Sequence, residues 1–215
     1  MITIPENNEI MGLPNDRVKA LTDGIFAIAM TILVLELRIP EMISTSQELN
    51  QSLLALLPEI TSYAASFIIL GTFWIANTTL FYFIKRTDRL FLWINVIFLM
   101  FISLIPFTAY LLGNYHDFQI SIIIYGLNLT ILGVLFFIKW KYALKHPNFL
   151  DTLPDKHFIK LVNKYILFAP FMYLIGIALS FVNPWISILL YVIVPLIYIL
   201  PNHLDEHLPG GRGHN

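Results

Sequence analysis

The segment Arg17–Arg38 has charged ends and a short apolar centre. Between Asp23 and Glu36 lie only twelve uncharged residues, Gly24 to Leu35, fewer than the roughly 20 that a lipid-facing helix needs to span a bilayer. Neighbouring helices or water must therefore meet the polar ends of this segment. We expect a helix inside a bundle, where it forms the wall of a pathway.

One face of this helix carries a stripe of branched aliphatic side chains. At about 100° per residue, Ile28, Ile32 and Leu35 fall within about 60° of each other. Thr31 borders the stripe, and its hydroxyl oxygen could replace water around a cation. Such stripes usually pack against other helices, but a stripe that faces an aqueous path forms a constriction that can wet or dewet. On this pattern alone, both packing and pore lining stay open.

Asp23 lies roughly opposite the stripe, so we expect it to pair inside the chain rather than to bind an ion. The expected members of this structural polar cluster, besides Asp23, are Arg17, Thr22, Trp74 and Asn77. His203 and His207 stand at helical spacing beside two acids in the C-terminal tail. There we expect solvated side chains rather than a metal site.

The composition indicates an integral membrane protein. Of the 215 residues, 57% are hydrophobic and only 13% are charged, whereas a soluble domain carries about a quarter charged residues. Cysteine is absent, which excludes disulfides and thiolate metal sites. The polar first twenty residues predict no cleavable signal peptide. The lipid bilayer is an expected partner, whereas nucleic acid and a cofactor are not.

The fold expected is all-α, with six transmembrane helices. They cover residues 16–38, 58–84, 90–112, 118–138, 165–182 and 184–200. Pro40–Gln51 is expected to be a polar connection and Lys139–Lys164 a basic linker, while Pro106, Pro170 and Pro195 would kink their helices. The predicted organisation is a polar leader (1–15), one six-helix transmembrane domain (16–202) and a polar tail (203–215).

The basic residues lie almost entirely on one side of this arrangement. Twelve of the 13 Lys and Arg residues fall on the side of the termini, and only Arg38 falls on the other. The positive-inside rule then places both termini in the cytoplasm and the chain in the plasma membrane. Five acids on the opposite side either concentrate cations at a mouth or are simply solvated. They are Glu36, Glu41, Glu48, Glu59 and Asp117.

A long motif occupies the first helix. The run RVKALTDGIFAIAMTILVLEL includes Arg17, Asp23, Gly24, Phe26, Ala27, Ile28, Ala29, Thr31, Leu33, Val34, Leu35 and Glu36. It resembles the first-helix signature of the endolysosomal potassium-channel family, transmembrane protein 175, in its prokaryotic branch. Residues 66–107 are similar to the second and third helices of that family. One departure is that Asn77 and Thr78 stand where the family usually has histidines, which argues against proton sensing through this cluster.

The resemblance implies both an architecture and a function. Prokaryotic members are similar to one another in having six helices per chain and four chains around a central pore that the first helix lines. The implied function is passive conduction of cations with a preference for potassium. By motif, the pore constriction falls on Ile28, with Ile32 and Leu35 beyond it and Thr31 adjacent. The implied partners are potassium ions and identical copies of the chain, which form a homotetramer.

Two other classes of function remain for comparison. A secondary transporter is the alternative, but it would require inverted repeats and charged residues near the membrane midplane, and the chain shows no internal repeat. An enzyme is not expected, because no predicted span contains paired carboxylates, metal-spaced histidines or a nucleophile with its base.

Overall fold

The chain forms a bundle of α-helices. The computed structural model describes residues 13–39, 42–151 and 154–199. The helices in these ranges are α1 (Asn15–Leu35), α2 (Ser46–Ala55), α3 (Leu57–Phe83), α4 (Arg89–Ser103), α5 (Ile105–Asn114), α6 (Gln119–Lys145), α7 (Lys156–Leu179) and α8 (Pro184–Ile199). A 3-10 turn, η1 (Pro147–Phe149), and two short strands, β1 (Leu13–Pro14) and β2 (Arg86–Thr87), complete these elements. The strands pair antiparallel at the start of α1.

Within the described ranges, five helical segments are long and apolar enough to cross a membrane. They are α1, α3, the pair α4–α5 (Arg89–Asn114), α6 and α7. α8 takes the place of the sixth predicted helix, but it has only 16 residues. The prediction of an all-helical membrane protein is therefore confirmed, whereas the sixth crossing stays a prediction.

The third predicted helix is divided in two. α4 ends at Ser103 and α5 begins at Ile105, with Leu104 between them in a right-handed helical conformation (φ −82°, ψ −14°). Pro106 stands in the first turn of α5, where a missing N–H leaves no helical hydrogen bond unmade. Pro170 and Pro195, in contrast, lie inside α7 and α8. Of the three predicted kinks, the one at Pro106 thus coincides with an interruption between two helices.

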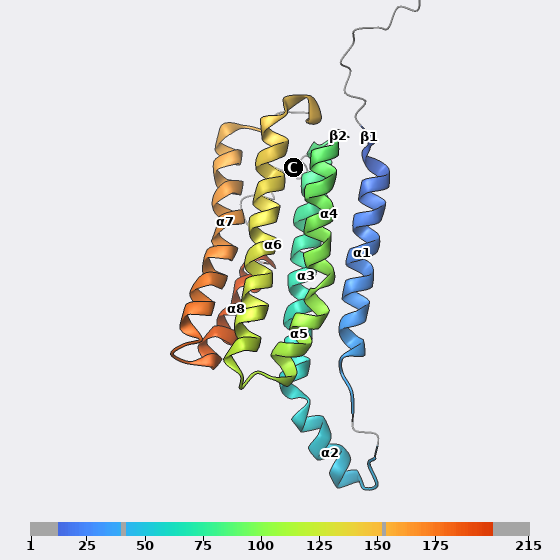
Figure 1. The fold of residues 1–215 in the computed structure, drawn as a ribbon, viewed down its shortest axis with the longest axis vertical. Helices are drawn as coiled ribbons and strands as arrows, with labels where there is room; N and C mark the ends of the chain where they lie inside the picture. The colour runs from blue at the N-terminus through green and yellow to red at the C-terminus, as the bar shows by residue number, and fades with distance from the viewer. Residues whose placement is uncertain (1–12, 40–41, 152–153, 200–215) are drawn as a thin grey trace, which may run out of the picture.

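The predicted polar connection over Pro40–Gln51 is wrong from Ser46 onward, because α2 begins there. Thr45 Oγ1 accepts a hydrogen bond from Glu48 N (3.2 Å), and Glu48 Oε2 accepts one from Thr45 N (3.3 Å). This reciprocal capping box satisfies two backbone donors at the start of the helix. α2 buries none of its residues, and Figure 1 shows it extending beyond one end of the bundle.

The predicted basic linker Lys139–Lys164 is wrong over much of its length. α6 continues through Lys145, and α7 already begins at Lys156. Lysine is a good helix former, and the first strong interruption is Pro147 at the start of η1. Lys139 consequently lies fully buried in the bundle rather than in a solvated loop.

α1 lies at one edge of the bundle and α7 at the other (Figure 1). α1 packs on α3, α4 and α5, while α6 packs on α4, α5, α7 and α8. Phe98 of α4 is fully buried, and its ring centroid lies 6.3 Å from Phe26, 6.0 Å from Phe73 and 6.1 Å from Phe136. Aromatic pairs at such distances stabilise a core beyond the area that they bury. This aromatic cluster joins α1, α3, α4 and α6.

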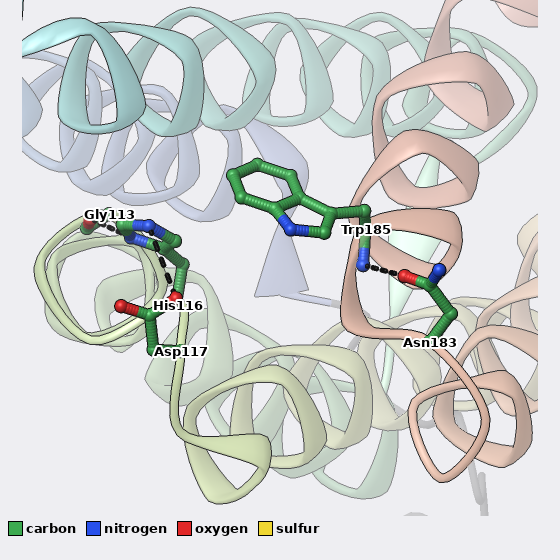
Figure 2. A network of polar contacts seen from close by, with 5 residues as sticks. All are labelled: Gly113, His116, Asp117, Asn183 and Trp185. Carbon is green, nitrogen blue, oxygen red and sulfur yellow. Dashed lines mark hydrogen bonds and ion pairs between the residues drawn. The ribbon is translucent and has the colours of Figure 1, made fainter.

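Two turns meet at the end of the bundle where α5 ends and α8 begins (Figure 2). His116 Nδ1 lies 3.1 Å from Gly113 O, and the His116 ring lies 5.4 Å from the Trp185 ring. Trp185 N donates a hydrogen bond to Asn183 Oδ1 (2.9 Å), so Asn183 caps α8. The contact between the His116 and Trp185 rings packs the turn between α5 and α6 against the first turn of α8.

Candidate pore-lining helix

α1 has one face packed on the bundle and one face exposed. Thr22, Phe26, Ala29 and Leu33 are buried, at the spacing of three and four residues that places side chains on one side of a helix. Phe26 belongs to the aromatic cluster around Phe98. The packed face thus fixes α1 to its own subunit, and what the other face contacts depends on its surroundings.

The exposed face carries the aliphatic stripe. Ile28 is 58% exposed, Ile32 37% and Leu35 63%, and Thr31 is exposed as well. Within a single chain these side chains are therefore open to lipid, to water or to another copy of the protein. Packing inside the subunit, one of the two interpretations of the stripe, does not account for such exposure.

The hydroxyl group of Thr31 donates its hydrogen bond within the helix. Its Oγ1 lies 3.0 Å from Ala27 O and 2.9 Å from Ile28 O, and donates to these carbonyls of the preceding turn. A hydroxyl oxygen carries two lone pairs in addition to its proton. Once the proton is directed back to the helix, the lone pairs are left on the exposed side, where they can accept from water or contact a cation.

Asp23 and Trp74 lie together. Trp74 Nε1 donates a hydrogen bond of 2.9 Å to Asp23 Oδ1 and so joins α3 to α1. Both side chains are exposed in the single chain. An acceptor that is engaged by an indole N–H is oriented by the protein, which fits a role for Asp23 in holding α1 rather than in binding an ion.

Two of the other predicted polar residues, Thr22 and Asn77, belong to a second, buried group. Asn95 Nδ2 donates to Thr22 Oγ1 (3.1 Å), while Lys139 Nζ donates to Asn95 Oδ1 (2.7 Å) and to Asn77 Oδ1 (2.5 Å). All four side chains are at most 2% exposed. The predicted cluster is thus two groups, one at the surface of the chain and one inside it, and the second joins α1, α3, α4 and α6.

The sequence pattern alone did not single out Asn95 or Lys139. A usable signal for the lysine was present, because the buried stripe of α6 continues at helical spacing through Phe136, Lys139 and Ala143. Arg17 is exposed on the surface of α1, and the structure joins it to neither group within the described residues. His203 and His207 lie outside those residues.

The acids predicted on the side of the membrane opposite the termini lie in different surroundings. Glu36 and Glu59 line the same small cleft, beside Asn114. Glu48 is engaged in the capping box of α2, and Asp117 is exposed. Glu41 lies outside the described residues. Of the four predicted acids that the structure describes, only Glu36 and Glu59 are brought together by the fold.

Comparison with known proteins identifies the family. The family described as endosomal/lysosomal potassium channel TMEM175 matches residues 17–106. A potassium channel of Chamaesiphon minutus is 31% identical to the chain over 192 residues, which cover 87% of this chain and 92% of that one. The chain belongs to the TMEM175 family. The resemblance inferred from the first-helix motif is thereby confirmed, and the TMEM175 family is one of ion channels rather than enzymes.

Two further relatives extend the TMEM175 match over most of the chain. A potassium channel of Chryseobacterium sp. is 32% identical over 190 residues, 88% of this chain and 95% of that one. The crystal structure of a lysosomal potassium-selective channel TMEM175 homolog from Chamaesiphon minutus matches with a TM-score of 0.77 and 30% identity, over 86% of this chain and 95% of that chain. The similarity therefore extends well beyond residues 17–106.

Proposed function

We propose that the protein is a potassium-preferring cation channel whose pore is lined by α1. The observation that carries the proposal is the exposed stripe of Ile28, Ile32 and Leu35 on a helix whose opposite face is fixed in the bundle. The comparisons support it, since two relatives are named potassium channels and the matching crystal structure is described as that of a potassium-selective channel. Conduction is passive and needs no cofactor.

The pore is formed by four copies of the chain. One lining helix cannot enclose a path, and a closed ring of identical subunits supplies the missing walls. In such a ring each α1 turns its exposed face to the central axis, so that the stripe meets three copies of itself. The channel domain covers residues 16–202, between a polar leader (1–15) and a polar tail (203–215).

Both termini lie in the cytoplasm, and α8 is the sixth crossing of the plasma membrane. The basic residues of the chain support this orientation through the positive-inside rule. The 16 residues of α8 extend about 24 Å at 1.5 Å per residue, somewhat less than the roughly 30 Å of a hydrocarbon core. Local thinning of the bilayer and flanking interfacial residues accommodate a mismatch of this size.

Ile28 forms the narrowest ring, with Ile32 and Leu35 beyond it. Branched aliphatic side chains cannot replace the water that an ion loses, so the ring penalises each ion by part of its hydration free energy. Potassium holds its water less tightly than sodium, and a dehydrating ring therefore penalises potassium less. The Thr31 oxygens, whose proton is directed into the helix, offset part of this cost beside the ring.

A secondary transporter explains the structure less well. Transporters place ionisable residues around a site near the membrane midplane, in discontinuous helices. In the described part of this chain, Lys139 is the one fully buried residue among Asp, Glu, His, Lys and Arg. It is engaged by two amide oxygens, and α1 is continuous from Asn15 to Leu35. A passive channel requires no such site.

Flux through purified protein tests the proposed function. Liposomes loaded with potassium chloride are diluted into an impermeant organic cation, and a protonophore with a pH-sensitive dye reports potassium efflux. We expect efflux that follows the potassium gradient alone and stays slower with sodium inside. Efflux equal to that of protein-free liposomes contradicts the channel, and efflux that requires a second ion on the opposite side favours the transporter.

Native mass spectrometry in detergent tests the assembly. The proposal predicts a species of four times the 24.8 kDa chain mass. A monomer that is stable in detergent and still conducts after reconstitution at one chain per liposome would refute the shared pore.

A further inference from the structure

Lys139 lies inside the helix bundle. Its side chain has no exposed surface, and Nζ lies 2.5 Å from Asn77 Oδ1 and 2.7 Å from Asn95 Oδ1. Among the described residues, no carboxylate lies within ion-pair distance of it. A charge in such a place is costly unless it is well hydrogen-bonded, and in a membrane protein it indicates a functional role.

Three phenylalanine rings complete the surroundings of the ammonium group. Nζ lies 4.5 Å from the ring centroid of Phe98, 5.3 Å from Phe81 and 5.9 Å from Phe91. Ring faces attract cations at these distances, and more strongly when water is excluded. The amide oxygens and the rings together hold Lys139 at a fixed position, although a well-packed apolar side chain could fill the same space without the cost of burying a charge.

Asn95 connects Lys139 to α1. Its Oδ1 accepts from Lys139, and its Nδ2 donates to Thr22 Oγ1 at 3.1 Å. An ammonium group can only donate, so Lys139 forces the oxygen of the Asn95 amide toward itself and the NH₂ group toward α1. Without the lysine, the amide could turn over and the bond to Thr22 would lose its fixed direction.

Thr22 stands on the packed face of α1. It has no exposed surface and lies about 120° around the helix from Ile28 at 100° per residue. Phe98, one of the three rings around Lys139 Nζ, packs against Phe26, which lies one turn after Thr22 on α1. Two points of contact at i and i+4 fix the rotation of a helix about its own axis, and with it the direction in which the stripe points.

We propose that Lys139 is a positioning residue that sets the rotation of α1, and hence the direction of Ile28, through Asn95 and Thr22. The inference rests on the proposed channel function. Lys139 does not touch the ion; it acts through the packed face of the helix whose opposite face lines the pore. Its loss loosens the ring at Ile28 and lowers the discrimination between potassium and sodium.

The test compares two lysines on α6. Lys139→Met keeps an unbranched side chain and removes the ammonium, whereas Lys141→Met removes an equal charge from an exposed lysine close by on the same helix. The measurement is the potassium-to-sodium permeability ratio from bi-ionic reversal potentials of assembled protein in planar bilayers. We expect Lys139→Met to lower the ratio about threefold, the factor equivalent to one typical interhelical hydrogen bond in a membrane, and Lys141→Met to leave it unchanged.

Two more variants distinguish a role of Lys139 in positioning α1 from a direct effect of its charge on the ions. Thr22→Val removes the acceptor on α1, and its effect should not add to that of Lys139→Met, because both break one connection. Asn95→Leu keeps the charge but breaks the connection, and it should lower the ratio as Lys139→Met does. If the charge acted on ions through space, Asn95→Leu would leave the ratio at the wild-type value, which overturns the proposal.

An assembled Lys139→Met protein with a wild-type ratio, or effects of Lys139→Met and Thr22→Val that multiply, overturns the inference while the channel function stands. If Lys139→Met does not assemble, Lys139→Met/Asn77→Leu, which removes one orphaned acceptor, is measured against the same two criteria. A wild-type protein without selective potassium flux refutes the proposed function itself, so the two failures are distinguishable.

Discussion

The indole N–H of Trp74 on α3 donates a hydrogen bond of 2.9 Å to the carboxylate of Asp23 on α1. The two residues are 51 positions apart in the sequence. Like the buried bond between Asn95 and Thr22 and the bond from Asn15 Nδ2 to Ile84 O, this contact joins α1 to the rest of its own chain. It lies at the surface of the chain, so its contribution to stability is modest.

Replacing Trp74 by Phe removes the donor and keeps an aromatic ring. We expect Trp74→Phe to lower the free energy of unfolding by about 1 kcal/mol, the usual net value of a hydrogen bond. Thermal unfolding of the purified protein in detergent measures the change. Trp93→Phe, at an exposed tryptophan of α4, is the control, and an equal loss in both variants would show that the bond to Asp23 contributes nothing.

The contact between α6 and α7 depends on Gly133. A Cβ atom at this position would lie 2.9 Å from Pro170 Cδ and 3.0 Å from Cγ, and a proline ring in a helix has little freedom to move. Overpacking of this kind costs about 1–3 kcal/mol, partly offset by the gain of about 1 kcal/mol in helix propensity from Gly to Ala. We expect Gly133→Ala to lower the unfolding temperature.

Gly71→Ala is the matched control for this prediction. At Gly71 the nearest atom to an added Cβ is Met30 Cε at 3.9 Å, an ordinary van der Waals distance. The variant should be as stable as the wild type or slightly more stable. If Gly133→Ala unfolds at the same temperature as Gly71→Ala, the close approach of α6 to Pro170 is not a determinant of stability.

The proposed orientation can be tested by labelling, because the chain contains no cysteine. Ser46→Cys and Asp117→Cys should react with a membrane-impermeant maleimide in intact cells, since both positions are exposed at the predicted outer side. Asn148→Cys, exposed in η1 at the opposite side, should react only after permeabilisation. The reverse pattern would invert the proposed topology.

Most of the transmembrane helices could be predicted because their ends carry local signals. Pro58 and Pro184 stand in the first turns of α3 and α8, and the charged residues after Ile84 end the second predicted helix close to its observed end. The capping box of α2 was equally local, with Thr45 followed by Glu48 three residues later. Its short, polar helix lacks an apolar run, so hydropathy favoured a connection there.

Helical spacing offered a signal for the position of Lys139 on α6, but its partners in the buried group could not be predicted with the same rules. A lysine after an apolar run usually marks the end of a membrane span, and its partners Asn77 and Asn95 lie 62 and 44 residues away in the sequence. Only the packing of α3, α4 and α6 brings them together. The stripe of Ile28, by contrast, follows from helical periodicity, but its exposure became visible only once the rest of the bundle was in place.

In the proposed channel, Ile28 rings the narrowest point of the pore. Ile28→Asn supplies an amide that can hydrate a passing ion, so the dehydration barrier falls. Ile28→Ala widens the ring instead, and we expect it to weaken selectivity as well. Leu33 is only 2% exposed on the packed face of α1; Leu33→Asn should reduce folding or assembly without altering the selectivity of the channels that form.

The most direct test is the bi-ionic reversal potential of assembled Ile28→Asn in planar bilayers, with potassium on one side and sodium on the other. If Ile28 rings the pore, the reversal potential shifts toward the value for equal permeabilities and the conductance becomes severalfold larger. A reversal potential and conductance equal to those of the wild type would contradict this role, because Ile28 would then face a packed interface rather than the ion path.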